Sequence, residues 1–143
     1  MKEYKYRQSE NRITHACHYH VVWCTTFRRP VLNDLMRIRM KGLIEDVCDK
    51  EQVTIFELDI QPHCVYMHCD MPPIAGVNNL VRRMKRRTAS VMRKEFPELY
   101  SRLPSLWTLH YFLSTEENKP TEKIEEWMQT QPRFHRVKGR DKK

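Results

Sequence analysis

The chain has 143 residues, of which 40% are hydrophobic and 31% are charged, enough to bury one core and too few for two domains of ordinary size. No apolar run is long enough to cross a bilayer or to serve as a secretory signal, so we expect a cytoplasmic protein without a membrane partner. The formal net charge of +8 favours a polyanionic partner, because clustered Lys and Arg side chains neutralise phosphates.

The cysteines give no sign of a disulfide framework or a zinc ribbon. Their number is odd, they are scattered, and no C-x-x-C pair occurs. We therefore interpret all five as reduced thiols: Cys17, Cys24, Cys48, Cys64 and Cys69.

The first third of the chain predicts an arm, a strand and a helix. Residues 1–13 are polar and aperiodic, which is typical of a loose arm. Residues 16–26 are rich in β-branched and aromatic side chains and predict a strand. Asn33 or Asp34 can cap the helix that follows. Its buried stripe is expected to consist of Leu35, Ile38, Leu43, Ile44 and Val47.

Two strands and a long helix come next. Residues 53–60 predict the second strand, and residues 64–71 predict the third, which Pro72 and Pro73 bring to an end. The following helix, over about residues 77–96, has one apolar stripe and otherwise basic faces.

The last third predicts a strand, a helix and a tail. Residues 106–115 have the composition of a fourth strand, and Pro120 is suited to the first turn of a helix that ends near Gln131. The basic tail over residues 133–143 is expected to be mobile, which leaves one domain over residues 14–132.

This order of elements predicts an α/β (α+β) fold of the ferredoxin-like type, with an extra C-terminal helix. Its four-stranded antiparallel sheet carries the first two helices on one face, and its first and third strands lie in the middle. Because side chains alternate along a strand, Val65, Met67 and Cys69 are expected under the helices. The other face is open unless the last helix or a partner covers it, and is expected to present His18, His20, Val22, Cys24, Cys64, Tyr66 and His68.

Five collinear segments resemble a known family: YHVVWCTTFRRPVL, QPHCVYMHCDMPP, LVRRMKRRTASVMRKEFPEL, SLWTLHYFLST and KIEEWMQTQ. In order and spacing they are similar to the single-tyrosine HUH transposases of the insertion-sequence-200/605 type. The resemblance implies a homodimeric enzyme that recognises hairpins in single-stranded DNA. In that family a tyrosine attacks a phosphodiester, and a divalent ion held by two histidines polarises the phosphate.

This sequence departs from the family at the catalytic positions. Cys64 and Tyr66 stand where the resemblance places the two metal-binding histidines, and Trp127 stands in place of the nucleophilic tyrosine. Gln131 matches a glutamine that can assist the metal. Tryptophan has no nucleophilic oxygen, and a phenol is a poor ligand for Mg²⁺ or Mn²⁺. We therefore expect an inactive site with no cofactor.

A rebuilt metal site is the alternative at this face. His18, His20, Cys64 and His68 could cluster there, and such a ligand set would favour zinc over magnesium. Tyr66 is also conceivable as a substitute nucleophile, although it does not lie on the helix that the family uses.

Positive charge is concentrated at the expected DNA-binding residues, which are Arg28, Arg29, Arg82, Arg83, Lys85, Arg86 and Arg87. The sequence predicts that neutralising Arg83 and Arg87 together weakens DNA binding and flattens its salt dependence. Phe27, Trp107 and Trp127 could stack on unpaired bases.

Three functions follow from these observations. The first is a DNA-binding protein of the transposase family that recognises single-stranded or hairpin DNA and is catalytically inactive. The second is an active transposase with an unorthodox metal site, using Mg²⁺, Mn²⁺ or zinc, or an unorthodox nucleophile. The third is an RNA-binding module built on the same sheet.

Overall fold

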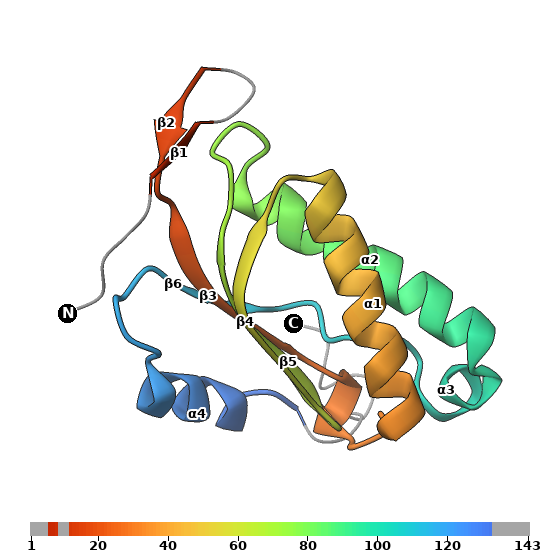
Figure 1. The fold of residues 1–143 in the computed structure, drawn as a ribbon. Helices are drawn as coiled ribbons and strands as arrows, with labels where there is room; N and C mark the ends of the chain where they lie inside the picture. The colour runs from red at the N-terminus through yellow and green to blue at the C-terminus, as the bar shows by residue number, and fades with distance from the viewer. Residues whose placement is uncertain (1–5, 9–11, 133–143) are drawn as a thin grey trace.

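The computed structural model describes residues 6–8 and 12–132, and its centre is a four-stranded antiparallel sheet (Figure 1). The strands are β3 (His18–Cys24), β4 (Thr54–Gln61), β5 (Cys64–Asp70) and β6 (Phe112–Ser114). Their order is β4-β5-β3-β6, so β3 and β5 lie side by side in the middle. This is the strand order of the predicted ferredoxin-like fold, which is confirmed.

Helices cover both faces of the sheet. The first, α1 (Asp34–Lys50), connects β3 to β4, and α2 (Val77–Glu95) connects β5 to β6. These two pack on one face, while α4 (Thr121–Gln129) lies on the opposite face (Figure 1). Short elements complete the order: η1 (Thr26–Arg28) after β3, and α3 (Pro97–Arg102) after α2. The last helix therefore covers the face that could have been open.

The start of α1 follows its capping residue. Asn33 Oδ1 accepts a hydrogen bond from the Met36 amide at 2.9 Å, which satisfies one unpaired amide of the first turn. The expected stripe is wrong at its first two positions, because Leu35 and Ile38 are 71% and 70% exposed. The helix instead buries Met36, Met40, Leu43, Ile44, Val47 and Cys48.

One apolar stripe fixes α2 on the sheet. Gly76 precedes the helix with φ of 87°, a conformation that suits glycine. The buried residues are Leu80, Val81, Met84, Thr88 and Met92. Every Arg and Lys of α2 therefore lies beside or opposite the buried stripe.

The fourth strand is shorter than predicted. Only Phe112–Ser114 joins the sheet, and upstream a single bridge pairs Trp107 with Thr25. Between Trp107 and Phe112, the main-chain oxygens of residues 108–110 accept hydrogen bonds from the Lys85 ammonium. These residues therefore do not continue the β3–β6 ladder.

The helix α3, which was not predicted, begins with Pro97 in its first turn.

The N-terminal residues that the structure describes are paired. β1 (Arg7–Gln8) and β2 (Thr14–His15) form a small antiparallel hairpin. The expectation of a loose arm is therefore wrong for Arg7 and Gln8. The expected tail over residues 133–143 lies outside the described residues.

Two apolar clusters hold the sheet and helices together. The larger lies between the sheet and the α1–α2 layer and contains Trp23 and Trp107, whose rings meet edge to face at 6.0 Å. The smaller lies under α4 and joins Val22, Tyr66 and Ile124. Within residues 6–8 and 12–132, no helix is both long enough and apolar enough to span a membrane.

Candidate functional site

On the face of the sheet that α4 partly covers, the two central strands present four facing pairs of side chains. The register pairs His18 with Asp70, His20 with His68, Val22 with Tyr66 and Cys24 with Cys64. The Thr25 amide donates to the His63 oxygen, so Thr25 and His63 form a hydrogen-bonded pair. Such pairs alternate along an antiparallel ladder with pairs whose main chains are not bonded to each other. The four pairs named here are all of this second type. Facing side chains approach most closely in such pairs. The predicted sharing of one face by these residues is confirmed.

His20 is fixed on both sides of its ring. Its Nε2 lies 2.8 Å from the Glu116 main-chain oxygen, which can only accept, so in the neutral ring Nε2 donates. Its Nδ1 then accepts from the Tyr66 hydroxyl, also at 2.8 Å. The ring stacks on His68 with centroids 4.3 Å apart. These contacts connect β3, β5 and the segment that leads into α4.

Tyr66 and Cys64 line a cleft beside α4, and both are almost fully buried. The cleft has a volume of about 470 Å³ and also contains His63, Lys119 and Gln129; we call it the α4 cleft. Tyr66 is 4% exposed, and burial raises its pKa to about 12. The Lys119 ammonium lies over the Tyr66 ring at 4.1 Å.

The Cys64 thiol is held neutral by its surroundings. Burial raises its pKa to about 12, and the neighbouring Cys24 and Asp59 add to the increase. Beside it, burial and the charge of Arg28 lower the pKa of His63. A neutral thiol is a weak metal ligand, since the thiolate is the form that binds metals.

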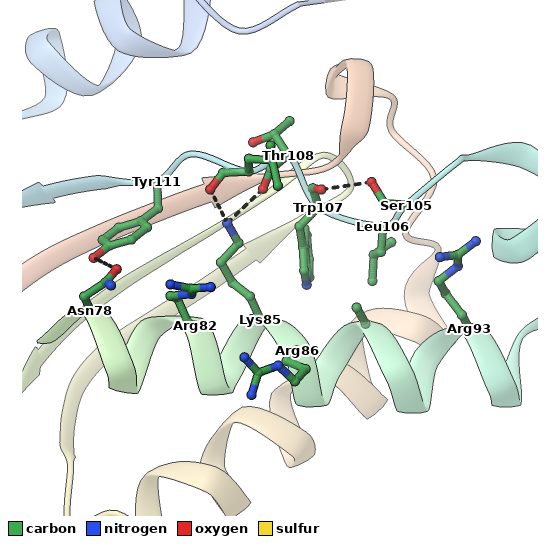
Figure 2. A pocket seen from close by; sticks show the side chains of 12 residues that line it. Asn78, Arg82, Lys85, Arg86, Arg93, Ser105, Leu106, Trp107, Thr108 and Tyr111 are labelled. Atoms are coloured by element: carbon green, nitrogen blue, oxygen red, sulfur yellow. Dashed lines mark hydrogen bonds between the residues drawn. The ribbon is translucent and has the colours of Figure 1, made fainter. Parts of the chain in front are cut away.

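A second hollow runs along α2 and faces residues 105–111 (Figure 2). We call it the α2 groove; its volume is about 410 Å³. Arg82, Lys85, Arg86 and Arg93 line it from the helix, and Trp107, Leu109 and Tyr111 line it from the facing segment. A cationic groove with aromatic and apolar side chains on one wall is suited to nucleic acid.

Lys85 ties the two walls of the α2 groove together. Its Nζ donates to the main-chain oxygens of Thr108 and Leu109 at 2.8 and 3.2 Å (Figure 2). It also donates to the His110 oxygen at 3.3 Å. Burial lowers the pKa of Lys85 to about 8. Tyr111 donates to Asn78 Oδ1 at 3.0 Å across the same gap. Lys85 therefore supports the groove wall, while Arg82 and Arg86 are the exposed cations.

Arg93 and Trp107 are also engaged within the protein. Arg93 donates to the Leu103 oxygen at 3.3 Å and lies over the Tyr100 ring at 4.1 Å. The Trp107 indole donates to Thr88 Oγ1 at 2.9 Å and is 6% exposed. Trp107 is therefore a core residue and is not presented for base stacking.

The other predicted DNA-binding cations do not line the α2 groove. Arg83 is paired with Glu51 at the end of α1. The hydrogen bond from Arg39 lowers the pKa of Glu95, and the charge of Arg87 makes a smaller contribution in the same direction. Arg29 lies over the Phe27 ring at 5.2 Å, next to η1. The cations of α2 thus fall on two sides of the helix.

A family model described as "Transposase IS200 like" matches residues 13–131. The chain belongs to the IS200-like transposases. It is 22% identical to the ISDra2 transposase TnpA of Deinococcus radiodurans over 115 residues, which are 79% of this chain and 82% of that protein. It is also 22% identical to the transposase for insertion sequence element IS200 of Salmonella typhimurium over 117 residues, or 80% of this chain and 76% of that one.

Two solved structures share the fold of this IS200-like transposase. A crystal structure from Deinococcus radiodurans R1, described as a transposase, superposes with a TM-score of 0.79 at 21% identity and covers 90% of this chain and 99% of that one. A REP-associated tyrosine transposase bound to a REP hairpin gives a TM-score of 0.55 at 13% identity, covering 87% and 68% of the two chains. At these identities the likeness shows the fold alone.

The structure brings together only part of the site expected for an IS200-like transposase. Cys64 and Tyr66 share the α4 cleft, whereas Trp127 and Gln131 do not line it. Trp127 packs on Phe112 with ring centroids 6.0 Å apart. Gln131 is buried, and its Oε1 accepts no hydrogen bond within the described part of the chain. Trp127 thus belongs to the apolar cluster between α4 and the sheet, next to Val22 and Tyr66.

The proposed zinc ligands do not assemble into one set. Cys64 and His68 lie four positions apart on the same strand, which separates them by about 13 Å. Both ring nitrogens of His20 are engaged by Tyr66 and Glu116. Across residues 6–8 and 12–132, no three His, Cys, Asp or Glu side chains are grouped to hold a metal ion.

Proposed function

We propose that this IS200-like transposase binds single-stranded or hairpin DNA in the α2 groove and does not cut it. The observation that supports binding is the placement of Arg82 and Arg86, which line the groove with exposed side chains. Phosphate contacts by such cations provide most of the affinity for nucleic acid. A protein of the same fold is described as bound to a REP hairpin, which makes a hairpin the first ligand to test.

The chemistry at the family's catalytic positions supports inactivity. Mg²⁺ and Mn²⁺ bind hard, readily charged ligands, whereas the Cys64 thiol and Tyr66 phenol keep their protons because burial raises each pKa to about 12. These residues do not fit the family's metal ion. Trp127 offers no nucleophilic oxygen. We therefore assign no cleavage step to this chain.

The binding proposal is tested with a fluorescent hairpin and its unpaired equivalent, titrated at several salt concentrations. Arg82→Gln/Arg86→Gln should lower affinity about tenfold or more and reduce the salt slope by about 1.5. Arg83→Gln/Arg87→Gln removes the same charge outside the groove, and a smaller effect is expected. Equal losses of DNA affinity in the two variants would contradict binding in the α2 groove. Preferential competition by RNA would favour the RNA-binding alternative.

The inactivity proposal is tested by looking for a covalent protein–DNA adduct. The purified protein is incubated with hairpin-bearing single-stranded DNA and Mg²⁺ or Mn²⁺, then separated under denaturing conditions. We expect no adduct. One observation favours the active alternative: the Tyr66 hydroxyl donates a hydrogen bond to His20 Nδ1, the arrangement in which a base can activate a nucleophile. An adduct that Tyr66→Phe abolishes would establish that alternative.

A homodimer is part of the same proposal. Leu35 and Ile38 are exposed on α1, and Ile38 shares a shallow hollow with Leu58 and Ile60 of the edge strand β4. Exposed apolar side chains beside an edge strand are typical of association surfaces. Sedimentation of wild type and Leu35→Lys/Ile38→Lys tests this: a monomeric wild type would contradict it. A cytoplasmic location and a domain over residues 14–132 stay predictions.

A further inference from the structure

Cys24 and Cys64 face each other across the two central strands. They are partners in the register of β3 and β5, and they share the face that α4 covers. Because the Thr25 amide donates to the His63 oxygen, this pair is of the type not directly hydrogen-bonded. The Cα atoms of such pairs lie about 4.5 Å apart, within the span of about 4.4–6.8 Å that a disulfide bridges.

The remaining cysteines cannot compete for Cys64 without unfolding. Cys69 is on the same strand but points to the opposite face, where it packs in the larger core cluster with Cys48. Cys17 precedes Cys24 by seven positions, about 23 Å of extended chain. Cys24 is therefore the only thiol of the described residues that faces Cys64.

We propose that Cys24 and Cys64 form a modification site at which a peroxide-class oxidant closes a reversible disulfide. Cys64 lines the α4 cleft and is 7% exposed, whereas Cys24 is fully buried. Small oxidants thus meet Cys64 first, and Cys24 acts as the resolving thiol. The site is independent of DNA binding and of the proposed inactivity.

The reaction balances in two steps. The Cys64 sulfur attacks one peroxide oxygen, so that an S–O bond forms, the O–O bond breaks, and the departing hydroxide leaves as water with the thiol proton. The Cys24 sulfur then attacks the sulfenic sulfur of Cys64, forming the S–S bond and releasing a second water. Two thiols are oxidised and one peroxide is reduced. Burial raises the pKa of both thiols, so each is almost wholly protonated even in mildly alkaline buffer, and the slow oxidation is therefore followed over hours.

The test is peptide mapping of the full-length protein after treatment with hydrogen peroxide and alkylation of the remaining thiols. Trypsin leaves Cys24 with Cys17 in residues 13–28, and Cys64 with Cys69 in residues 51–82. Fragmentation spectra must therefore locate the bond. We expect a Cys24–Cys64 cross-link that lacks two hydrogens and disappears with dithiothreitol.

Three variants make the result decisive. Cys24→Ser and Cys64→Ser should each abolish the cross-link, while Cys17→Ser should retain it. Circular dichroism of each variant verifies folding before oxidation. The proposal is overturned if both thiols stay free, if Cys64 proceeds to sulfinic acid with Cys24 unmodified, or if the bond joins another pair such as Cys48–Cys69.

Discussion

The Arg7 guanidinium lies 3.1 Å from the Asp70 carboxylate and joins the N-terminal hairpin to the end of β5. Asp70 is 1% exposed and also accepts from the Cys17 amide at 3.3 Å. His15 Nδ1 lies 3.3 Å from the same carboxylate. A buried carboxylate with several donors stabilises the fold only while its partners remain.

Asp70→Asn should therefore destabilise the protein by about 2 kcal/mol, because the charge partner of Arg7 is lost in a buried setting. The loss is at the low end for a buried pair, since the Arg7 side chain is 28% exposed. Denaturant unfolding measures the effect. Asp46→Asn, which breaks an exposed pair with Lys50, is the control and should change stability by less than about 0.5 kcal/mol.

Lys85→Met should loosen the wall of the α2 groove. The substitution keeps the aliphatic stem but removes the donor to the oxygens of residues 108–110, at a cost of about 1–2 kcal/mol. Amide hydrogen exchange over residues 105–111 should accelerate. Lys94→Met, which removes an exposed charge at the end of the same helix, is the control. If exchange over residues 105–111 also accelerated in Lys94→Met, loss of the Lys85 contacts would not be the cause.

The protein should lose stability at alkaline pH because buried groups hold their protons. The folded pKa of Cys64 is about 12 against an ordinary 9.0. The stabilisation is therefore complete below pH 9 and is lost as the pH rises toward 12. Cys64→Ala removes this titrating thiol. The free energy of unfolding of the variant should therefore fall less steeply with pH than that of the wild type, by at most about 1.4 kcal/mol per pH unit. Parallel curves for the two proteins would contradict the assignment.

Restoring the family's residues should create cleavage activity if inactivity arises from their replacement. Cys64→His/Tyr66→His/Trp127→Tyr introduces two imidazoles and a phenol at the positions implied by the resemblance. We expect an adduct with hairpin DNA that depends on Mg²⁺ or Mn²⁺. The Cys64→His/Tyr66→His variant, which keeps Trp127, is the control and should form none. An adduct with the unaltered chain would refute the inactivity proposal directly.

Local pattern predicts much of this fold, and long-range packing accounts for the rest. The alternation of β5 places Val65 and Tyr66 on opposite faces as expected. In α1, Met36 and Met40 compete with Leu35 and Ile38 for the buried side, and the packing of α1 against α2 and β4 decides between the two stripes. The α2 groove depends on the long-range contacts between Lys85 and the oxygens of residues 108–110, which no local sequence signal reveals.

The facing register of β3 and β5 also has an evolutionary consequence. Positions 64 and 66 share their space with Cys24 and Val22, and Tyr66 is bonded to His20 as well. A lineage that changes one member of such a pair alters the packing of the other, so substitutions along these strands should covary two by two among homologues. Introducing two histidines at positions 64 and 66 therefore changes the packing around Cys24, Val22 and His20 as well as the chemistry of the cleft.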